Sequence, residues 1–346
     1  MTTNNQVNEL RRKIILGTTA LPLIGAGSYA FADANVNLKI SHQFPGGTID
    51  QGDFRDRLCR KFAVEVEKKS KGSMKLQVYP GSSLMKTNAQ FGALRKGALD
   101  ISLVPLPYSG GEVLEANIGL MPALVTSYEQ AMKWKTAECG RMLSKVLEDK
   151  GIVILSWVWQ GGGIASRTKA LVNPEDAKGM KIRGGSREFD LMLKSVGASV
   201  ISLPSNEIYA AMQTGAMDAA YTSSTSFISF KLEELSKHFT SARNRSYWFM
   251  LEPLMMSKQI FDSLSKEQRD ILMSVGADME KFGYESAKAD DKLAASVYAK
   301  AGSKIYDLND AVIKKWQEVA RQTAWKDFAE RSPSCAALLT AAEKLL

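Results

Sequence analysis

The stretch that decides the fold is residues 180–221, MKIRGGSREFDLMLKSVGASVISLPSNEIYAAMQTGAMDAAY. Apolar strand-like segments alternate in it with segments of helical apolar spacing, and glycines mark several of the boundaries. The expected order is strand 180–183, helix 187–196, strand 199–203, helix 206–214 and strand 216–221. Strands separated by helices predict an α/β fold whose sheet is parallel or mixed and is covered on both faces.

The same alternation occurs earlier in the chain. The segments expected there are strand 36–41, helix 49–69, strand 74–79, helix 84–96, strand 99–104, helix 127–150 and strand 152–159. Three consecutive glycines, 161–163, follow and are expected to let the chain bend between the two units. Helix-start signals come later, at Asn173–Asp176 and in the capping box Ser265–Gln268.

Two such units predict a two-lobed α/β clam shell. Each lobe is expected to hold a central mixed sheet flanked by helices, with a ligand cleft between the lobes. We expect residues 35–160 with about 249–288 in one lobe, and 161–248 with about 289–340 in the other.

The composition of the 346-residue chain narrows the classes of function. Its formal net charge is +8, but basic residues alternate with acidic ones, so the sequence predicts no stripe for binding nucleic acid. Two histidines argue against a multi-histidine metal site, and three widely spaced cysteines cannot build a zinc cluster or a disulfide scaffold. We expect Cys59, Cys139 and Cys335 to be small buried side chains, with any pairing left open. No metal and no cofactor are expected.

The first 34 residues have the pattern of a secretory signal peptide. Arg11, Arg12 and Lys13 precede an apolar run over 14–27, and cleavage is expected after Ala32 or Ala34. The run is shorter than the roughly 20 residues that span a bilayer. The arginine pair leaves the general secretory and the twin-arginine routes open, and both predict a periplasmic protein.

The sequence lacks the familiar catalytic motifs. Residues 166–169 match the S-x-x-K pattern of β-lactamases, but extended sequence follows and no K-T-G occurs. Nucleophile-elbow, zinc-protease, Walker and dinucleotide patterns are also missing. An enzyme is therefore not predicted.

Arg183 is the strongest candidate for ligand binding. It ends a predicted strand and precedes Gly184 and Gly185. In open α/β folds ligands lie at the carboxyl ends of strands, and an arginine can bind a carboxylate through two parallel hydrogen bonds. The alternative is a surface arginine that pairs with Glu188 or Asp190 and contributes little stability.

Two runs, NPEDAKGMKIR at 173–183 and EIYAAMQTGAMD at 207–218, resemble the signature of the solute-binding proteins of TRAP transporters, the DctP family. The resemblance extends over nearly the whole mature chain. It implies that Arg183 pairs with the carboxylate of an organic acid, and it implies further cleft residues near the other strand ends. The ligand-binding residues expected on this basis are Arg183, Ser186, Tyr221, Thr222, Tyr247, Trp159, Gly163 and His42.

The chain departs from the family members that bind sugar acids. Gly163 stands where sialic-acid binders carry a second arginine, and Tyr221 and Thr222 replace a Glu-Asn pair. We therefore expect a monocarboxylate, namely a 2-oxo, 2-hydroxy or aromatic acid, against a flat wall that includes Tyr221 and Tyr247. His42 is expected either to donate to the carboxylate or to cap its strand.

The sequence thus predicts a periplasmic binding protein that captures a small organic monocarboxylate and delivers it to the membrane permease of a TRAP transporter. No catalysis is implied. Two alternatives stay open: a binding protein of another importer or of a sensor, and a secreted enzyme on a two-lobed α/β scaffold.

Overall fold

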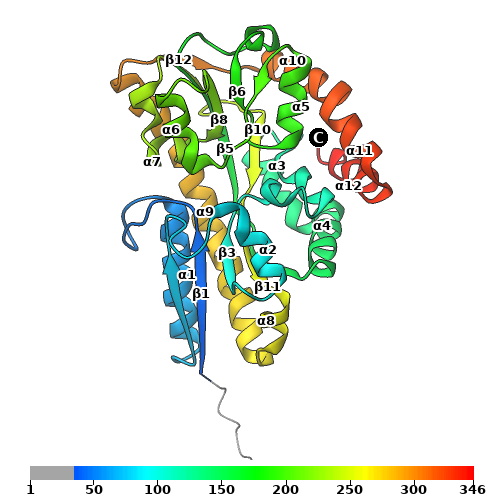
Figure 1. Ribbon diagram of the computed structural model, residues 1–346. Coiled ribbons are helices and arrows are strands. Elements are labelled where there is room, and N and C mark those ends of the chain that lie inside the picture. The colour runs from blue at the N-terminus through cyan, green and yellow to red at the C-terminus, as the bar shows by residue number, and fades with distance from the viewer. Residues whose placement is uncertain (1–34) are drawn as a thin grey trace, which may run out of the picture. The chain divides into compact units, whose positions relative to one another are not determined.

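The structure, a computed structural model, describes residues 35–346, and its strands form two sheets (Figure 1). The first sheet has the order β2-β1-β3-β11-β4. Its strands are β1 (Val36–His42), β2 (Met74–Tyr79), β3 (Ile101–Leu103), β4 (Ile152–Ser156) and β11 (Leu254–Ser257). β1 runs parallel to β2 and β3, whereas β11 is antiparallel to β3 and β4. The sheet is therefore mixed.

The second sheet has the order β12-β9-β5-β8-β6-β7, with β10 paired to β5. Its strands are β5 (Trp159–Ser166), β6 (Lys181–Arg183), β7 (Ser199–Val200), β8 (Ala219–Ser223), β9 (His238–Ser241), β10 (Trp248–Leu251) and β12 (Lys304–Asp307). β6 is parallel to β7 and β8, and β5 is antiparallel to β8, β9 and β10. Two mixed sheets flanked by helices confirm the predicted α/β architecture.

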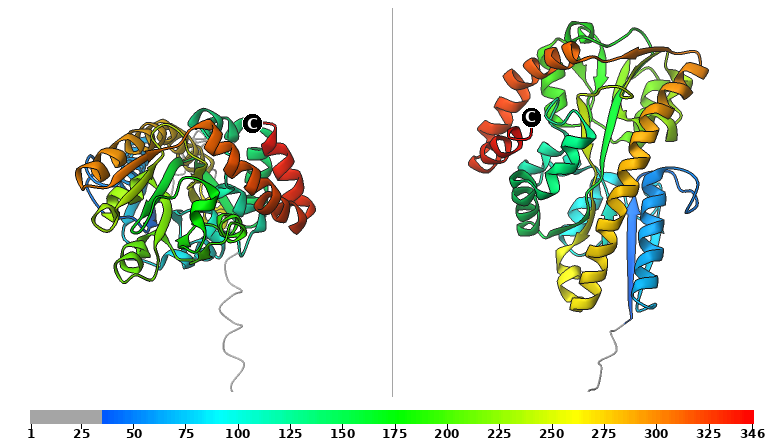
Figure 2. Two further views of the ribbon diagram at one scale, coloured as in Figure 1. Left: turned by 90° about the horizontal axis from the view of Figure 1, so that it is seen from above. Right: turned by 180° about the vertical axis from the view of Figure 1, so that it is seen from behind.

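Helices flank both sheets, and one of them accompanies both (Figure 2). The α-helices are α1 (Phe54–Lys69), α2 (Gln90–Arg95), α3 (Tyr128–Lys133), α4 (Glu138–Asp149), α5 (Arg187–Ser195), α6 (Ile208–Gln213), α7 (Ser224–Ser229), α8 (Lys258–Ser263), α9 (Lys266–Lys300), α10 (Asp310–Ala320), α11 (Lys326–Arg331) and α12 (Pro333–Glu343). α9 spans 35 residues and contacts β4 of the first sheet as well as β5, β9 and β12 of the second.

The chain crosses between the sheets earlier than the sequence predicts. It passes from β4 to β5 at residues 157–158 and returns between β10 and β11 at residues 252–253. The prediction that glycines 161–163 form a bend is wrong, because they lie inside β5 and are buried. A Cβ on Gly162 would collide with the Thr222 carbonyl oxygen and the Trp248 ring, so close packing and not flexibility requires glycine there.

Several predicted helices are shorter than expected. α1 begins at Phe54 and not at residue 49, because the Asp53 side chain accepts a hydrogen bond from the Arg55 amide and caps the helix. The helix predicted over 127–150 is interrupted by a 3₁₀ turn at Trp134–Thr136, which separates α3 from α4. The capping box of α9, Ser265 with Gln268, is confirmed.

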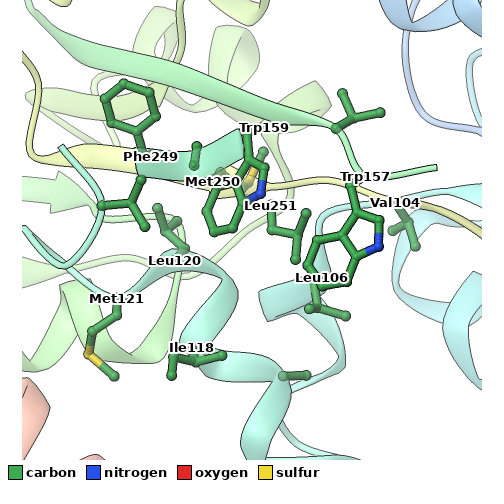
Figure 3. Close-up of a cluster of buried hydrophobic side chains, with 14 of the residues drawn as sticks. Val104, Leu106, Ile118, Leu120, Met121, Trp157, Trp159, Phe249, Met250 and Leu251 are labelled. Atoms are coloured by element: carbon green, nitrogen blue, oxygen red, sulfur yellow. The ribbon is translucent and has the colours of Figure 1, made fainter. Parts of the chain in front are cut away.

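A cluster of buried apolar side chains connects β5 and β10, the strands next to the two crossings, to the turns that follow β3 (Figure 3). Trp157 and Trp159 lie beside Leu106, Leu120 and their neighbours in this cluster. Trp157 is 8% exposed and therefore belongs to the core. The turns after β3 are thereby fixed against the strands that link the two sheets.

The signal peptide and its two cleavage positions lie outside the described residues. Among residues 35–346, no helix is both long and apolar enough to cross a bilayer. The three cysteines are buried and unpaired, as expected of small apolar side chains.

Candidate functional site

Arg183 ends β6 and is 2% exposed, so its guanidinium lies inside the protein. Its Nε donates to the Leu203 carbonyl (3.2 Å), its Nη1 to the Tyr221 carbonyl (2.7 Å) and its Nη2 to the Tyr108 hydroxyl (2.8 Å). All three acceptors are neutral, and no carboxylate within residues 35–346 forms an ion pair with Arg183. A buried cation is normally paired with an anion, so this one points to an anionic ligand.

A cavity of about 880 Å³ opens at Arg183. Elements of both sheets border it: Asn88 and the turns after β3 on one side, β6, α5 and the segment after β7 on the other. Its charged residues are Arg183, Arg187, Lys194, Arg331, Asp190 and Glu207. Basic side chains thus outnumber acidic ones, which favours an anion in the cavity.

Tyr108 contributes the polar group that faces Arg183 from the first sheet's side. It lies in the 3₁₀ turn Leu106–Ser109, and its hydroxyl oxygen accepts from Arg183 and from the Ser205 amide (3.0 Å). Two donors occupy both lone pairs, so the hydroxyl hydrogen is left to donate to another group. Sequence analysis missed Tyr108, although the rule that ligands lie beyond the carboxyl ends of strands applies to β3 as well as to β6.

Ser186 and Asp190 complete the wall around α5. The Ser186 hydroxyl accepts from the Phe189 amide (3.1 Å), which caps α5, and donates to the Leu120 carbonyl (3.0 Å). Burial raises the pKa of Asp190 to about 6, while the nearby charge of Arg183 lowers it in part. Arg183 thus has one carboxyl nearby, but no carboxylate within residues 35–346 is bonded to it.

Known proteins share this architecture. A sequence model of the bacterial extracellular solute-binding proteins, family 7 (DctP), matches residues 52–332. The chain belongs to this family. A solute-binding protein from Albidiferax ferrireducens is 67% identical over 92% of this chain and 94% of its own. A TRAP periplasmic solute-binding protein from Rhodoferax ferrireducens, solved with bound malonate, is 68% identical over 89% of this chain and 98% of its own, with a TM-score of 0.88. The C4-dicarboxylate-binding periplasmic protein DctP of Rhodobacter capsulatus is 27% identical over 90% and 92%.

The predicted resemblance to the DctP family is therefore confirmed, and the protein is a TRAP periplasmic solute-binding protein. Of the residues predicted to bind the ligand, Arg183 and Ser186 line the cavity. The other six do not line it.

Tyr221 and Tyr247 pack against each other in the core beside the second sheet. Their hydroxyl oxygens lie 2.8 Å apart, and both rings contact Phe189. Neither tyrosine lines the cavity. Tyr221 acts on the site through its backbone carbonyl, which holds Arg183. Thr222, the next residue of β8, is 2% exposed.

Trp159 and Gly163 belong to β5. The Trp159 ring packs on that of Trp134, with centroids 5.2 Å apart, and Gly163 pairs with Thr222 in the sheet. Both residues are part of the scaffold of the second sheet, and neither lines the cavity.

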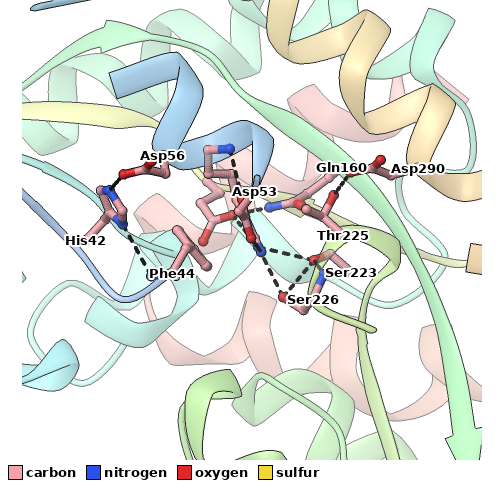
Figure 4. Close-up of polar contacts among 11 residues, drawn as sticks. His42, Phe44, Asp53, Asp56, Gln160, Ser223, Thr225, Ser226 and Asp290 are labelled. Atoms are coloured by element: carbon pink, nitrogen blue, oxygen red, sulfur yellow. Dashed lines mark hydrogen bonds and ion pairs between the residues drawn. The ribbon is translucent and has the colours of Figure 1, made fainter. Parts of the chain in front are cut away.

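His42 stands at the end of β1, where its ring is held on both sides (Figure 4). Nε2 lies 3.1 Å from Asp56 Oδ1, and Nδ1 accepts from the Phe44 amide at 3.3 Å. This fixes Nε2 as the donor to the carboxylate. Of the two roles expected for His42, the structure shows the one that ties the strand end to the helix after it.

Proposed function

We propose that the protein captures a small organic carboxylate in the cavity at Arg183 and delivers it to the membrane permease of a TRAP transporter. The observation that carries this proposal is the buried guanidinium of Arg183, which has only neutral partners within residues 35–346. A carboxylate would supply the missing negative charge. No chemical step is involved.

The donors at Arg183 fit a carboxylate. Its recorded bonds use three of the five N–H groups of a guanidinium and leave one on each terminal nitrogen. The hydroxyl hydrogen of Tyr108 is a third donor beside them. Charge-assisted hydrogen bonds of this kind are about twice as strong as neutral ones.

We place the ligand among short aliphatic carboxylates. Malonate, which the Rhodoferax ferrireducens relative binds, is the first compound to test, and the Rhodobacter capsulatus relative is named for C4-dicarboxylates. The 2-oxo and 2-hydroxy monocarboxylates predicted from the sequence are also short aliphatic carboxylates, so they remain candidates. An aromatic acid loses support, because Tyr221 and Tyr247 contact each other and do not border the cavity.

We further propose that two lobes close on the ligand, with the predicted boundaries moved to the two crossings: residues 35–156 with about 254–288 form one lobe, and residues 159–251 with about 289–340 form the other. The bonds from Tyr108 to Arg183 and to Ser205 support this, because they join elements that belong to different sheets. The crossings at residues 157–158 and 252–253 are the places where a hinge would bend.

A thermal-shift screen of the exported chain tests the proposal. A ligand at 100 times its Kd adds about 2.7 kcal/mol of stability, so a binder raises the unfolding midpoint clearly. We expect shifts with malonate or its short-chain homologues, and full recovery of the unchanged acid after incubation. Shifts confined to sugars or to cationic solutes would contradict the carboxylate, and conversion of the acid would favour the enzyme alternative.

A further inference from the structure

Arg55 is a second fully buried arginine, far from Arg183 in the sequence. It lies in the first turn of α1, and its side chain is 1% exposed. Nε and Nη2 donate to the two carboxylate oxygens of Asp53 at 2.9 and 2.6 Å, and the guanidinium stacks 3.5 Å from the centre of the Phe44 ring. Its orientation is therefore fixed from the side of the first sheet.

The remaining nitrogen of Arg55 reaches the second sheet. Nη1 donates to Ser226 Oγ at 3.1 Å and to Ser223 Oγ at 3.3 Å, as Figure 4 shows around the labelled serines. Ser223 is the last residue of β8 and Ser226 lies in the first turn of α7. Arg55 thus binds the end of a strand that belongs to the other sheet.

The segment that crosses back between the sheets joins the same group. Glu252, between β10 and β11, lies 3.4 Å from Nη1 of Arg55 and accepts a hydrogen bond from the side-chain Nε2 of Gln160 in β5. We call Asp53, Arg55, Ser223, Ser226 and Glu252 the Arg55 cluster.

The long helix α9 holds the same turn from another side. The Ser224 hydroxyl donates to Asp291 at 2.5 Å, and the Thr225 hydroxyl donates to Asp290 at 2.7 Å. Four consecutive hydroxyl side chains, residues 223–226, therefore bind either α1 or α9. The end of β8 is the point where both helices are attached to the second sheet.

The end of β8 is also what holds the ligand-binding arginine. The carbonyl that accepts from Arg183 Nη1 belongs to Tyr221, two residues before Ser223. A displacement of this strand end would move that carbonyl and turn the Arg183 guanidinium. The two buried arginines are thus connected through three residues of one strand.

We propose that Arg55 is a positioning residue, which fastens the end of β8 to α1. It thereby sets the orientation of the Arg183 guanidinium when the two proposed lobes close. A buried ion pair is often no more stabilising than apolar residues of the same volume, so the Arg55 cluster makes better sense as a device for orientation than for stability. Arg55 does not line the cavity, and it acts on the ligand only through β8.

The test compares Arg55→Lys and Ser226→Ala with Arg60→Lys as a matched control. Arg60 lies about one turn further along α1 and also bonds a carboxylate, Asp56 at 2.7 Å, but it has no hydrogen bond or ion pair to the second sheet among the residues described. Lysine keeps the positive charge of Arg55 but lacks the planar guanidinium that bonds both oxygens of Asp53. Ser226→Ala is the milder change, and it keeps the test possible if Arg55→Lys folds poorly.

Two readouts are needed. The first is hydrogen exchange, without ligand, of a peptide covering residues 219–230. The second is the kinetics of malonate binding, which rests on the proposed function. We expect faster exchange in that peptide, malonate dissociation about 10-fold faster and a nearly unchanged association rate in both variants, since changes within one site act mainly on dissociation. The control should match the original chain in both.

Unchanged exchange in residues 219–230 would overturn the fastening role. Faster exchange with unchanged malonate kinetics would overturn the positioning role, because a merely structural cluster behaves in that way. Should the original chain not bind malonate, the proposed ligand fails, and the exchange comparison still decides whether Arg55 fastens β8.

Discussion

The hydroxyl oxygen of Tyr108 lies 2.8 Å from Nη2 of Arg183, although Tyr108 follows β3 of the first sheet and Arg183 ends β6 of the second. The same oxygen accepts from the Ser205 amide, so one phenol is bonded to two segments of the second sheet's unit. This contact places a neutral donor and a buried cation on one side of the cavity.

Arg183→Lys is expected to weaken malonate binding nearly as much as Arg183→Ala. An ammonium cannot reproduce the guanidinium fork against a planar carboxylate, and the loss should be on the order of 2 to 5 kcal/mol. Titration calorimetry measures it. Arg187→Lys is the control, because Arg187 lines the same cavity but its guanidinium is bonded to Asp327. Equal affinity in Arg183→Lys and the original chain would remove Arg183 from the site.

Tyr108→Phe removes one oxygen and leaves the ring. Arg183 Nη2 and the Ser205 amide then lose their acceptor, and the ligand loses a donor, so we expect a loss of about 1.5 to 3 kcal/mol in binding free energy. Calorimetry with malonate gives the number. Tyr306→Phe is the matched control, since its hydroxyl bonds His238 at the edge of the second sheet. A similar loss in both variants would show that Tyr108 has no special place at the site.

The sequence predicted the fold well where the apolar pattern is periodic. β2 has the predicted bounds, and β6 with Arg183 at its end differs by one residue. Local caps were also readable, as at Ser265, because they depend on residues three positions apart.

Contacts between distant segments could not be predicted in this way. Tyr108 meets Arg183 across 75 positions, and Arg55 meets Ser226 across 171, so no spacing in the sequence records either pair. At Tyr221, where the chain departs from the sugar-acid binders of its family, the sequence suggested a ligand contact, whereas the structure places the side chain in the core, with its hydroxyl 2.8 Å from that of Tyr247. Whether a side chain at a strand end faces the cavity depends on the packing of both sheets.

Gly162→Ala is expected to destabilise the chain. A Cβ there collides with the Thr222 carbonyl and the Trp248 ring, which belong to neighbouring strands and cannot move independently. Overpacking of this kind costs about 1 to 3 kcal/mol, and a backbone contact puts this site at the upper end. Chemical denaturation measures the change. Gly111→Ala, where an added Cβ meets nothing within 4 Å, should stay within about 0.5 kcal/mol. Equal stability of the two variants would mean that β5 bends at its glycines after all.

Asp291 predicts a dependence of stability on pH. Burial raises the pKa of this α9 carboxyl to about 7, against bonds from Ser224 and Tyr128 that lower it. Between its ordinary pKa of 3.8 and about 7, the folded chain keeps a proton that the unfolded chain has lost. The free energy of unfolding therefore falls as the pH rises, by at most about 1.4 kcal/mol per pH unit for one group.

Asp291→Asn keeps a neutral side chain of the same shape at every pH. We expect its unfolding free energy to fall less steeply between about pH 4 and pH 7 than that of the original chain, because one titrating group is gone while Glu188 and Glu252, whose pKa values burial raises to about 7, remain. Urea denaturation at a series of pH values measures both curves. Asp149→Asn, at an exposed carboxylate, should run parallel to the original. If the Asp291→Asn curve were also parallel, the buried carboxyl would be charged throughout this range, and its bonds to Ser224 and Tyr128 would then outweigh the effect of burial.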